Sequence, residues 1–494
     1  MAYKTSQQRR RAAKQAVTHL PQQLLTIKSI DIEGNGVAHH NGKVVFVRGA
    51  ITGEQVQVQI TRTKPSYDKA EIVHVIKSSS QRAIPACVHF GVCGGCSLQH
   101  IEADSQVAIK QRALEDSLIH IAKVKVETIL PPISGLSWGY RYRARFSIKN
   151  VVKKNTVLVG FHERASTYVA DIKSCAILPL HVSNLMLPLR ELIAKLSVHS
   201  QVPQIEVAVG EADTVLLMRH LAPLTPTDIA YMDEFAHFHS PNQQNISTNL
   251  KQSNLQFNLQ FNLQSNLFNQ STHAIIWYTQ AAGPDSIQPL HTERKGNLHY
   301  TLPEFNIVMP FKVSDFTQVN YPMNRVLVSK ALALLMPQPG EQILDLFCGL
   351  GNFTLPLAQT VGKTGKVMGI EGSEALTARA HSNAIYNHLL NTSFKVSNLF
   401  TIKTEDLYEW GYFDRWLIDP PREGAQAVCE ALLNLPLNHC PKRIVYVSCN
   451  PATLARDAAI LCKTGKWLLS QAGIANMFPH TSHVESIAVF ECLN

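Results

Sequence analysis

From about residue 313 onward, short apolar runs alternate with longer amphipathic stretches. Runs of strand length occupy residues 343–347, 367–370, 394–396, 416–418 and 444–447, and stretches with helical periodicity cover 373–390 and 425–433. This alternation is typical of a doubly wound α/β sheet, a Rossmann-like fold. Residues 466–474 and 486–490 are predicted to close the sheet as an antiparallel pair. We therefore predict one α/β domain over residues 313–494.

The N-terminal part of the chain has a strand-like pattern instead. Residues 24–32, 43–47, 55–61 and 70–76 alternate apolar and polar positions, with glycines between them. Several short strands with glycine turns predict a small β-barrel of the OB type over residues 21–80. Arg62, Lys64 and Lys69 could supply charge to an oligonucleotide groove, although a folding module with incidental basic residues fits the same pattern.

Residues 81–312 are predicted to form an α+β middle domain. The segment from Trp138 to Phe146 interleaves aromatic residues with Arg141, Arg143 and Arg145. On a strand these arginines would share one face, which suits either RNA phosphates or a solvated strand surface. Residues 240–272 carry a four-residue Asn-Leu-Gln repeat, which indicates a low-complexity insertion on a loop.

The charge balance favours a polyanionic partner. Lys and Arg exceed Asp and Glu by 46 − 37 = 9, although a basic excess by itself is not specific. Residues 1–20 contain Arg9, Arg10 and Arg11 and no acid, so we expect a basic N-terminal tail. No apolar run reaches membrane-spanning length, and no signal peptide follows Met1. We therefore expect a cytoplasmic protein without a membrane partner.

Four of the ten cysteines have a spacing that indicates a metal site. They are Cys87, Cys93, Cys96 and Cys175. In a chain without a secretion signal the thiols should stay reduced, which argues against a disulfide framework. Structural zinc usually takes two paired knuckles, and only one pair is present, even with His89 as a further ligand. A four-cysteine iron–sulfur cluster with Cys175 as the remote ligand fits the spacing better.

A glycine-rich turn after the first strand of the α/β domain predicts a cofactor site. Asp345, Gly349 and Gly351 lie between this strand and a helix, where glycines let the backbone approach a ligand. The third glycine of a dinucleotide fingerprint is missing. Glu371 ends the second strand, where a carboxylate can bind ribose hydroxyls, and Asn398 follows the third, where it can reach adenine. The ordered set fits S-adenosylmethionine.

A cysteine at the end of a later strand predicts covalent catalysis. Residues 443–448 read as a strand that ends at Cys449, and Asn450-Pro451 then stops it. Ligands bind at the carboxyl ends of strands in such sheets. Asp419-Pro-Pro-Arg422 ends the preceding strand. Amino-methyltransferases carry an aromatic residue after a similar Asp-Pro-Pro, and Arg422 disfavours that interpretation.

Methylation of uracil at C5 needs one thiol and one base. C5 becomes nucleophilic only after a thiolate has added to C6, and a base must then remove the C5 proton. Cys449 suits the first role and Glu485, in the segment His480-Thr-Ser-His-Val-Glu485, suits the second. Since an ordinary thiol has a pKa of about 8.5, Cys449 needs an activating neighbour, and Arg422 is the candidate. Phe316 and Gln318 could stack on and hydrogen-bond the extruded base.

Taken together, these motifs resemble those of the RNA uracil-5 methyltransferase family, in particular its iron–sulfur members that act on 23S ribosomal RNA. The resemblance covers nearly the whole chain, and residues 34–50 are similar to a TRAM domain, a small RNA-binding barrel. It implies a [4Fe–4S] cluster on the four cysteines, Cys449 as nucleophile and Glu485 as base. It also implies that a further set lines the cofactor and substrate pocket. This set is Gln318, Phe347, Asn352, Glu371, Asn398 and Asp419.

The implied function is formation of 5-methyluridine in 23S ribosomal RNA, offered as free or precursor RNA with the target base flipped out. No obligate protein partner is expected. Another ribosomal or transfer RNA position is the first alternative, and a non-catalytic iron–sulfur RNA-binding protein is the second. Cytosine-5 RNA methyltransferases place a cysteine at the Asp-Pro motif, and none follows Pro421 here.

Overall fold

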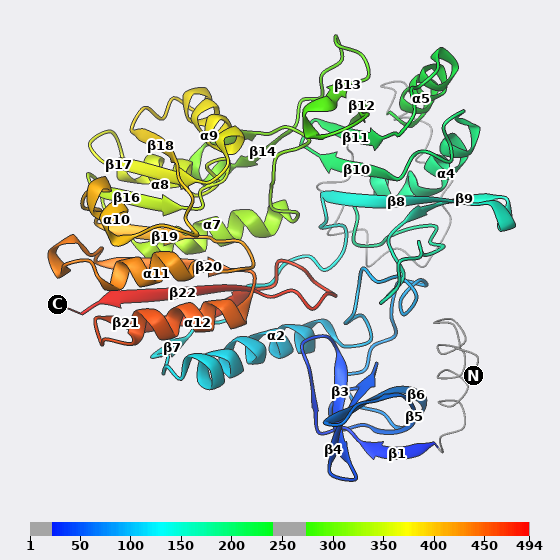
Figure 1. The fold of residues 1–494 in the computed structure, drawn as a ribbon, viewed down its shortest axis with the longest axis horizontal. Helices are drawn as coiled ribbons and strands as arrows, with labels where there is room; N and C mark the ends of the chain where they lie inside the picture. The colour runs from blue at the N-terminus through cyan, green and yellow to red at the C-terminus, as the bar shows by residue number, and fades with distance from the viewer. Residues whose placement is uncertain (1–21, 241–272, 494) are drawn as a thin grey trace, which may run out of the picture.

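The computed structural model describes residues 22–240 and 273–493. The predicted basic tail and the Asn-Leu-Gln repeat lie outside these residues. Figure 1 shows a small β unit at the N-terminal end, a second sheet in the middle of the chain, and a larger C-terminal sheet with helices on both faces. Within the described residues, no helix combines the length and the apolar character that a bilayer crossing requires.

The N-terminal unit is a curled six-stranded sheet with the strand order β1-β5-β6-β4-β3-β2. Its strands are β1 (Gln23–Thr26), β2 (Ser29–Ile30), β3 (Asn35–His40), β4 (Lys43–Arg48), β5 (Gln55–Thr63) and β6 (Tyr67–Lys77). The sequence predicts four strand regions here but not β3, because Gly34 and Gly36 look like breaks. Gly36 instead lies within β3, where a Cβ atom would come 2.8 Å from the side chains of Ile27 and Ala50. The glycine therefore permits close packing in this small core.

The middle sheet has the order β13-β12-β11-β10-β8-β9, and helices cover one of its faces (Figure 1). Its strands are β8 (Arg143–Val151), β9 (Thr156–Gly160), β10 (Gln204–Val209), β11 (Asp213–Arg219), β12 (Ala274–Gln280) and β13 (Ile287–Pro289). The helices are α3 (Leu180–Asn184), α4 (Met186–Lys195) and α5 (Pro226–His239). Leu189 of α4, Phe235 of α5 and Trp277 of β12 share one buried cluster, which holds the helices on the sheet.

The predicted arginine row divides into three different environments. Arg141 precedes β8 and lines a cavity described below. Arg143 donates to the backbone carbonyls of Val313 and Asp315, and burial lowers its pKa. Arg145 is exposed and pairs with Glu206 at 2.9 Å. Arg143 and Arg145 alternate with buried residues on one face of β8, as predicted, whereas Arg141 precedes the strand. Because the guanidinium of Arg143 anchors the connection between two domains, the three arginines do not form one row.

The C-terminal sheet contains eight strands within the described residues, in the order β18-β17-β16-β19-β20-β22-β21-β7. They are β16 (Gln342–Leu346), β17 (Lys366–Glu371), β18 (Thr392–Val396), β19 (Arg415–Ile418), β20 (Arg443–Ser448), β21 (Trp467–Ala475), β22 (Glu485–Cys492) and β7 (Thr128–Ile129). The five strands from the edge strand β18 to β20 are parallel, and β22 lies antiparallel between β20 and β21. The predicted α/β order and the predicted antiparallel closure are confirmed.

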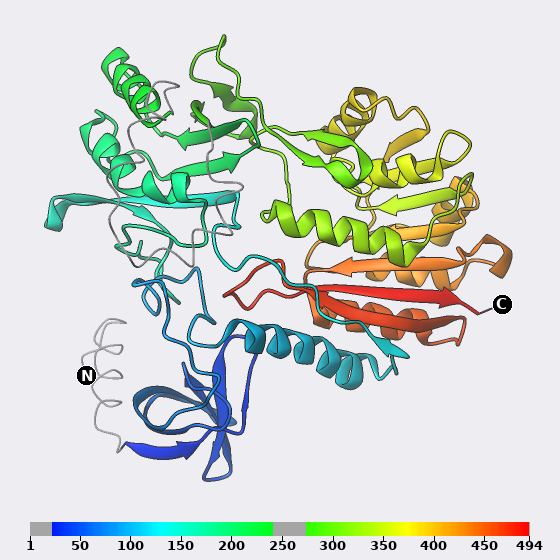
Figure 2. The same ribbon diagram turned by 180° about the vertical axis from the view of Figure 1, so that it is seen from behind.

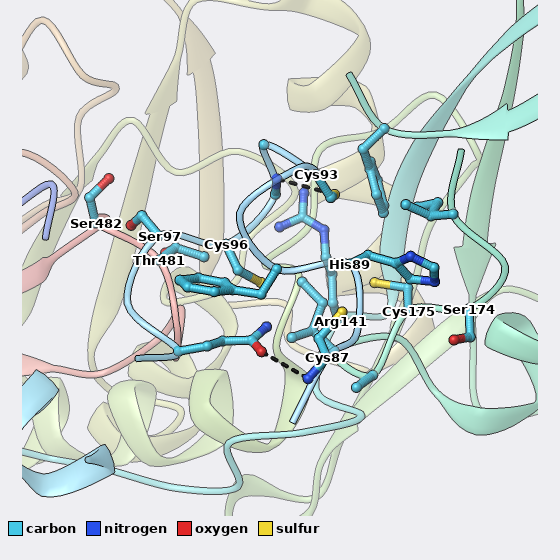
Figure 3. A pocket seen from close by; sticks show the side chains of 18 of the residues that line it. Cys87, His89, Cys93, Cys96, Ser97, Arg141, Ser174, Cys175, Thr481 and Ser482 are labelled. Atoms are coloured by element: carbon cyan, nitrogen blue, oxygen red, sulfur yellow. Dashed lines mark hydrogen bonds between the residues drawn. The ribbon is translucent and has the colours of Figure 1, made fainter. Parts of the chain in front are cut away.

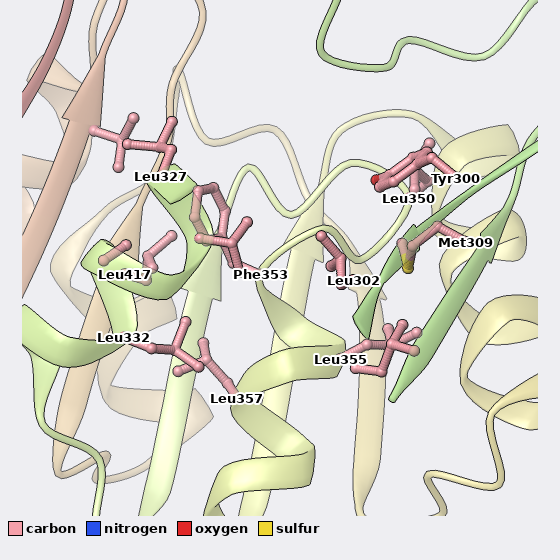
Figure 4. Packing of buried hydrophobic residues seen from close by; sticks show 14 of the residues in the cluster. Tyr300, Leu302, Met309, Leu327, Leu332, Leu350, Phe353, Leu355, Leu357 and Leu417 are labelled. Atoms are coloured by element: carbon pink, nitrogen blue, oxygen red, sulfur yellow. The ribbon is translucent and has the colours of Figure 1, made fainter. Parts of the chain in front are cut away.

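Helices cover both faces of this sheet (Figure 2). They are α7 (Tyr321–Leu335), α8 (Thr354–Val361), α9 (Glu374–Tyr386), α10 (Thr404–Trp410), α11 (Gln426–Leu433) and α12 (Pro451–Cys462). On one face, the hairpin of β14 (His299–Leu302) and β15 (Ile307–Pro310) packs against the sheet domain. Figure 4 shows Leu302 and Met309 of this hairpin beside Leu350 and Leu355. The middle and C-terminal parts thus share one core.

An early helix also belongs with the C-terminal sheet. Helix α2 (Ala103–Ser117) continues as a short π-helical turn, Leu118–Ala122, and buries Leu114 and Leu118 among residues of α12 and β21. Strand β7 then pairs with β21 at the edge of the same sheet. No sequence pattern predicts this packing, which brings residues near the cysteine motif close to the predicted active site.

Candidate active site and cysteine cavity

The register of two strands brings Cys449 and Glu485 to the same edge of the C-terminal sheet. Ser448, the last residue of β20, pairs with Ser486 of β22. Because the strands are antiparallel, Cys449 follows one member of this pair and Glu485 precedes the other. Asp419 follows β19, which is the other neighbour of β20. Three chemically active side chains thus converge where three neighbouring strands end or begin.

The electrostatics of this group favour neutral forms. Burial raises the pKa of the Cys449 thiol to about 11, and the charges of Glu485 and Asp419 act in the same direction. Desolvation raises the pKa of Asp419 to about 7. Burial and the Asp419 charge raise the pKa of Glu485 well above its usual value. The two carboxyl groups share one environment, so their protons come off as a coupled pair.

Arg422 lies on the turn after Asp419 and is exposed. Its positive charge lowers the pKa of Cys449, as predicted, but burial and the two acids outweigh it. The carbonyl oxygen of Arg422 accepts hydrogen bonds from Asn450 Nδ2 at 3.2 Å and Thr453 Oγ1 at 3.3 Å. The turn is therefore tied to the start of α12, directly after Cys449.

A buried network that was missed by sequence reasoning supports the same turn. The Tyr446 hydroxyl on β20 donates to Asp457 Oδ2 on α12 at 2.7 Å, and the Ala425 backbone N–H donates to the same oxygen at 2.7 Å. Both Tyr446 and Asp457 are fully buried. An aspartate inside an amphipathic helix carries no sequence mark of this role, because its partners come from two other segments.

The glycine turn after β16 has the geometry expected of a cofactor loop. Gly349 and Gly351 have φ values of 56° and 95°, which favour glycine, and a Cβ on Gly351 would lie 2.5 Å from Leu355. Glu371 accepts from the Gly349 N–H at 3.1 Å and the Ser373 N–H at 2.9 Å. The predicted acid at the end of the second strand therefore lies directly beside the glycine turn.

The other predicted pocket residues lie near this turn and differ in burial and in hydrogen bonding. Phe347 is half-buried, and its ring centroid lies 5.7 Å from that of Phe400. Asn398 is exposed and accepts from the Phe400 N–H at 3.0 Å. Asn352 exchanges two side-chain hydrogen bonds with Asn324, of 2.8 and 3.0 Å, and so fixes the loop against α7. Phe400, which was missed by sequence reasoning, shares the turn with Asn398.

The predicted base-contacting residues lie on the irregular segment between β15 and α7. The Phe316 side chain is 70% exposed, which is unusual for phenylalanine and leaves its ring free to stack. Gln318 is half-buried on the same segment. The structure therefore places Phe316 where a nucleobase from solvent can reach it.

The four predicted ligand cysteines line one cavity of about 280 Å³ (Figure 3). Arg141, Thr481, Ser482 and His483 line it as well. Cys93 Sγ accepts a hydrogen bond from the Gly95 N–H at 3.4 Å, and His89 Nε2 accepts from the Lys173 N–H at 3.1 Å. In residues 22–240 and 273–493, no three His, Cys, Asp or Glu side chains form a group that could hold a single metal ion.

The segment from Asn476 to Val484 lines this cavity through Thr481, Ser482 and His483 and leads into Glu485. Its backbone accepts hydrogen bonds from several buried side chains, among them Lys110 of α2 and Asn320, the N-cap of α7. Both residues were missed by sequence reasoning. Lys110 lies on the apolar face of an ordinary amphipathic helix, and its importance becomes visible only once α2 is placed on the C-terminal sheet.

Together, the parallel sheet, the glycine turn and the acid at the end of β17 define a methyltransferase that uses S-adenosylmethionine. The family model for tRNA (Uracil-5-)-methyltransferases matches residues 299–492, and that for the TRAM domain matches residues 22–73. A crystal structure of the Pyrococcus abyssi tRNA (uracil-54, C5)-methyltransferase with S-adenosyl-L-homocysteine has a TM-score of 0.65 and 22% identity. It covers 95% of this chain and 100% of that one, and so shows the same fold.

Curated relatives identify the family. The 23S rRNA (uracil(1939)-C(5))-methyltransferase RlmD of Bordetella bronchiseptica is 52% identical over 472 residues, which cover 95% of this chain and 93% of the relative. The RlmD protein of Cupriavidus necator is 51% identical over 94% of this chain and 100% of its own length. The chain belongs to the RlmD family of RNA uracil-5 methyltransferases, and its first domain is a TRAM domain.

Proposed function

We propose that this enzyme acts in the cytoplasm on 23S ribosomal RNA and methylates C5 of the uracil that corresponds to position 1939. The proposal rests on the RlmD relatives, whose names specify that base. The observation that carries the chemistry is the convergence of Cys449, Glu485 and Asp419 at one sheet edge. A thiol beside a buried carboxyl group supplies the nucleophile and the base that covalent pyrimidine methylation requires.

Cys449 is the proposed nucleophile. Its sulfur forms a bond to C6 of the flipped uracil, and the displaced electron pair moves to C5 and O4. The thiol proton must leave first, since the pKa of Cys449 is raised to about 11 in the free enzyme. Arg422 lowers this pKa and supports the thiolate. C5 then takes the methyl group that S-adenosylmethionine supplies when it is bound.

Glu485 is the proposed general base. After methylation C5 carries both a methyl group and a proton, and Glu485 removes the proton. The electron pair restores the C5–C6 double bond and expels the Cys449 thiolate. A carboxylate with a raised pKa is a stronger base than an ordinary one, so the environment of Glu485 suits this step. Asp419 and Glu485 titrate together, so the proton that Glu485 removes is shared between the two carboxyl groups.

The remaining predicted residues have proposed binding roles. Glu371, Asn398 and Phe347 surround the glycine turn and would hold the ribose and adenine of the cofactor. Asn352 would shape the turn, since its side chain is bonded to Asn324. Gln318 would lie between cofactor and base, and Phe316 would stack on the extruded uracil.

We also propose that the cysteine cavity holds a [4Fe–4S] cluster on Cys87, Cys93, Cys96 and Cys175. The thiols surround a cavity of about 280 Å³, which suits a group larger than one ion. Ligands of a single zinc ion would converge to within about 4 Å of one another, given Zn–S bonds of about 2.3 Å. His89 Nε2 is already an acceptor from Lys173, which supports four cysteines as the ligand set.

A methyl-transfer assay tests the substrate. Full-length enzyme with radiolabelled S-adenosylmethionine is offered unmodified 23S rRNA and, separately, unmodified tRNA. The expected label lies on uracil 1939 of 23S rRNA, and a 23S rRNA with cytosine at that position should stay unlabelled. Label on tRNA or on another ribosomal uracil would overturn the target while leaving the chemistry intact.

A further inference from the structure

The loop that precedes Glu485 is held through four of its own consecutive backbone carbonyl groups, each of which accepts a hydrogen bond from another part of the chain. The oxygens of Met477, Phe478, Pro479 and His480 accept from Asn320 Nδ2, Lys110 Nζ, the Tyr140 hydroxyl and the backbone N–H groups of Ser97 and Leu98. The donors come from α7, α2, the start of the middle domain and the cysteine loop. A loop outside any strand is thus fixed from several sides.

Helix α2 contributes two buried side chains to this arrangement. Gln106 and Lys110 are one helical turn apart and only 2% and 0% exposed. Lys110 Nζ lies 2.8 Å from both Asn476 Oδ1 and the Phe478 carbonyl oxygen. Gln106 Oε1 accepts from the His480 N–H at 2.9 Å. Together they hold the loop at three points between Asn476 and His480.

Burying a lysine has a large desolvation free energy, which packing alone does not explain. Both hydrogen-bond partners of Lys110 are neutral oxygens, and burial lowers its pKa to about 7. Leucine or methionine would fill the same space on α2 without the desolvation cost of an ammonium group. The functional feature of Lys110 is therefore its fixed set of donors, which point at the loop that leads to Glu485.

The held loop connects directly to the reacting groups. Glu485 pairs with Ala475 at the base of the loop, so the loop leaves and re-enters the sheet at the base residue itself. His483 Nδ1 lies 3.4 Å from Arg422 Nη2, on the turn beside Cys449. A shift of the loop would therefore move Glu485 and the surroundings of Arg422 together.

We propose that Lys110, assisted by Gln106, is a positioning residue that holds the loop 476–484 so that Glu485 faces C5 of the methylated uracil. The proposal rests on the role of Glu485 as base. Lys110 touches neither substrate nor cofactor, and it acts on the step in which the C5 proton passes to Glu485 and the C6–S bond breaks. A displaced base slows this step after the methyl group has been transferred.

Accumulation of the covalent intermediate tests the proposal. Full-length Lys110→Met, Glu485→Gln and wild-type enzymes are incubated with ordinary uracil-containing 23S rRNA fragment and S-adenosylmethionine, and protein–RNA adduct is measured on denaturing gels. Glu485→Gln should trap methylated adduct. Lys110→Met should trap about tenfold more than wild type, with kcat and KM lowered together and kcat/KM unchanged, because the slowed step follows the methyl transfer. Arg112→Met, an exposed position on the same helix, should behave as wild type.

Two further results distinguish positioning from folding. Lys110→Arg keeps a donor group and should restore turnover at least in part, and Gln106→Leu should also accumulate adduct. If Glu485→Gln traps adduct and Lys110→Met does not, the inference is overturned while the proposed function stands. If Lys110→Met and Gln106→Leu both lose S-adenosylmethionine binding, the residues are structural and the inference is again overturned. If Glu485→Gln traps nothing, the base role itself fails.

Discussion

Cys449 and Glu485 flank a paired position of two antiparallel strands, since Ser448 of β20 pairs with Ser486 of β22. The register of the sheet therefore sets the backbone positions of the proposed nucleophile and the proposed base. A shift by one residue would turn every side chain of β22 to the other face and remove Glu485 from the site.

The methylation rate should rise with pH from neutral to alkaline conditions. Cys449 has a pKa of about 11, so the thiolate fraction grows with each pH unit in this range. The carboxyl pair of Asp419 and Glu485 acts in the later step, in which Glu485 removes the C5 proton, so the methyl-transfer rate follows the thiolate fraction. Single-turnover rates from pH 6 to pH 9 check this, and a rate that falls over that range would contradict it.

Arg422→Ala should lower the rate at any fixed pH in the same experiment, because removing the guanidinium raises the pKa of Cys449 further. Arg422→Lys retains the charge and serves as the matched control. An unchanged pH profile in Arg422→Ala would show that the charge of Arg422 has no part in thiol activation.

Glu485→Gln should make the protein more stable at alkaline pH. The native pKa of Glu485 is raised, so the native state binds a proton that the unfolded state has lost above its pKa of 4.5. Stability is therefore lost as pH rises from 4.5 through the native pKa. We expect a rise of about 2 °C or more in Tm at pH 8. At pH 5 the difference should shrink. A Glu485→Gln variant that melts at a lower temperature than wild type at pH 8 would contradict the claim that burial of ionised Glu485 destabilises the native state.

Cys175→Ser should abolish the visible absorbance and the acid-labile sulfide of anaerobically purified protein. Cys175 is the proposed ligand most distant in sequence, and it lines the same cavity as the other three cysteines. Cys462→Ser on α12 is the control, because Cys462 lies outside that cavity. Colourless wild-type protein that contains zinc would contradict the cluster.

The sequence predicts much of the C-terminal sheet because β16, β17, β19 and β20 are apolar runs, and β17, β19 and β20 are followed by or end in a residue with chemistry. Glu371, Asp419 and Cys449 can therefore be placed at strand ends from the apolar runs alone. The position of Glu485 opposite Cys449 follows only once β22 is inserted between β20 and β21. Lys110 and Arg143 show the limit: each looks like a solvated cation in sequence, and each is bound to carbonyl groups of a distant segment.

The local environment of Cys449 was also beyond sequence reasoning. Arg422 is adjacent and has the predicted sign of effect, but the desolvation of Cys449 and the charges of two acids are larger. The balance depends on how deeply three strand ends enclose the thiol. Spacing along the chain carries no information on that depth.

The most direct test of the central claim uses 23S rRNA fragment that contains 5-fluorouracil at the target position, with S-adenosylmethionine. Fluorine cannot leave C5 as a proton does, so Glu485 has nothing to remove and the Cys449–C6 bond should persist. Wild-type enzyme should form an adduct stable on a denaturing gel, with the methyl group attached, and Cys449→Ala should form none. Absence of adduct with wild type, or its presence with Cys449→Ala, would contradict the account.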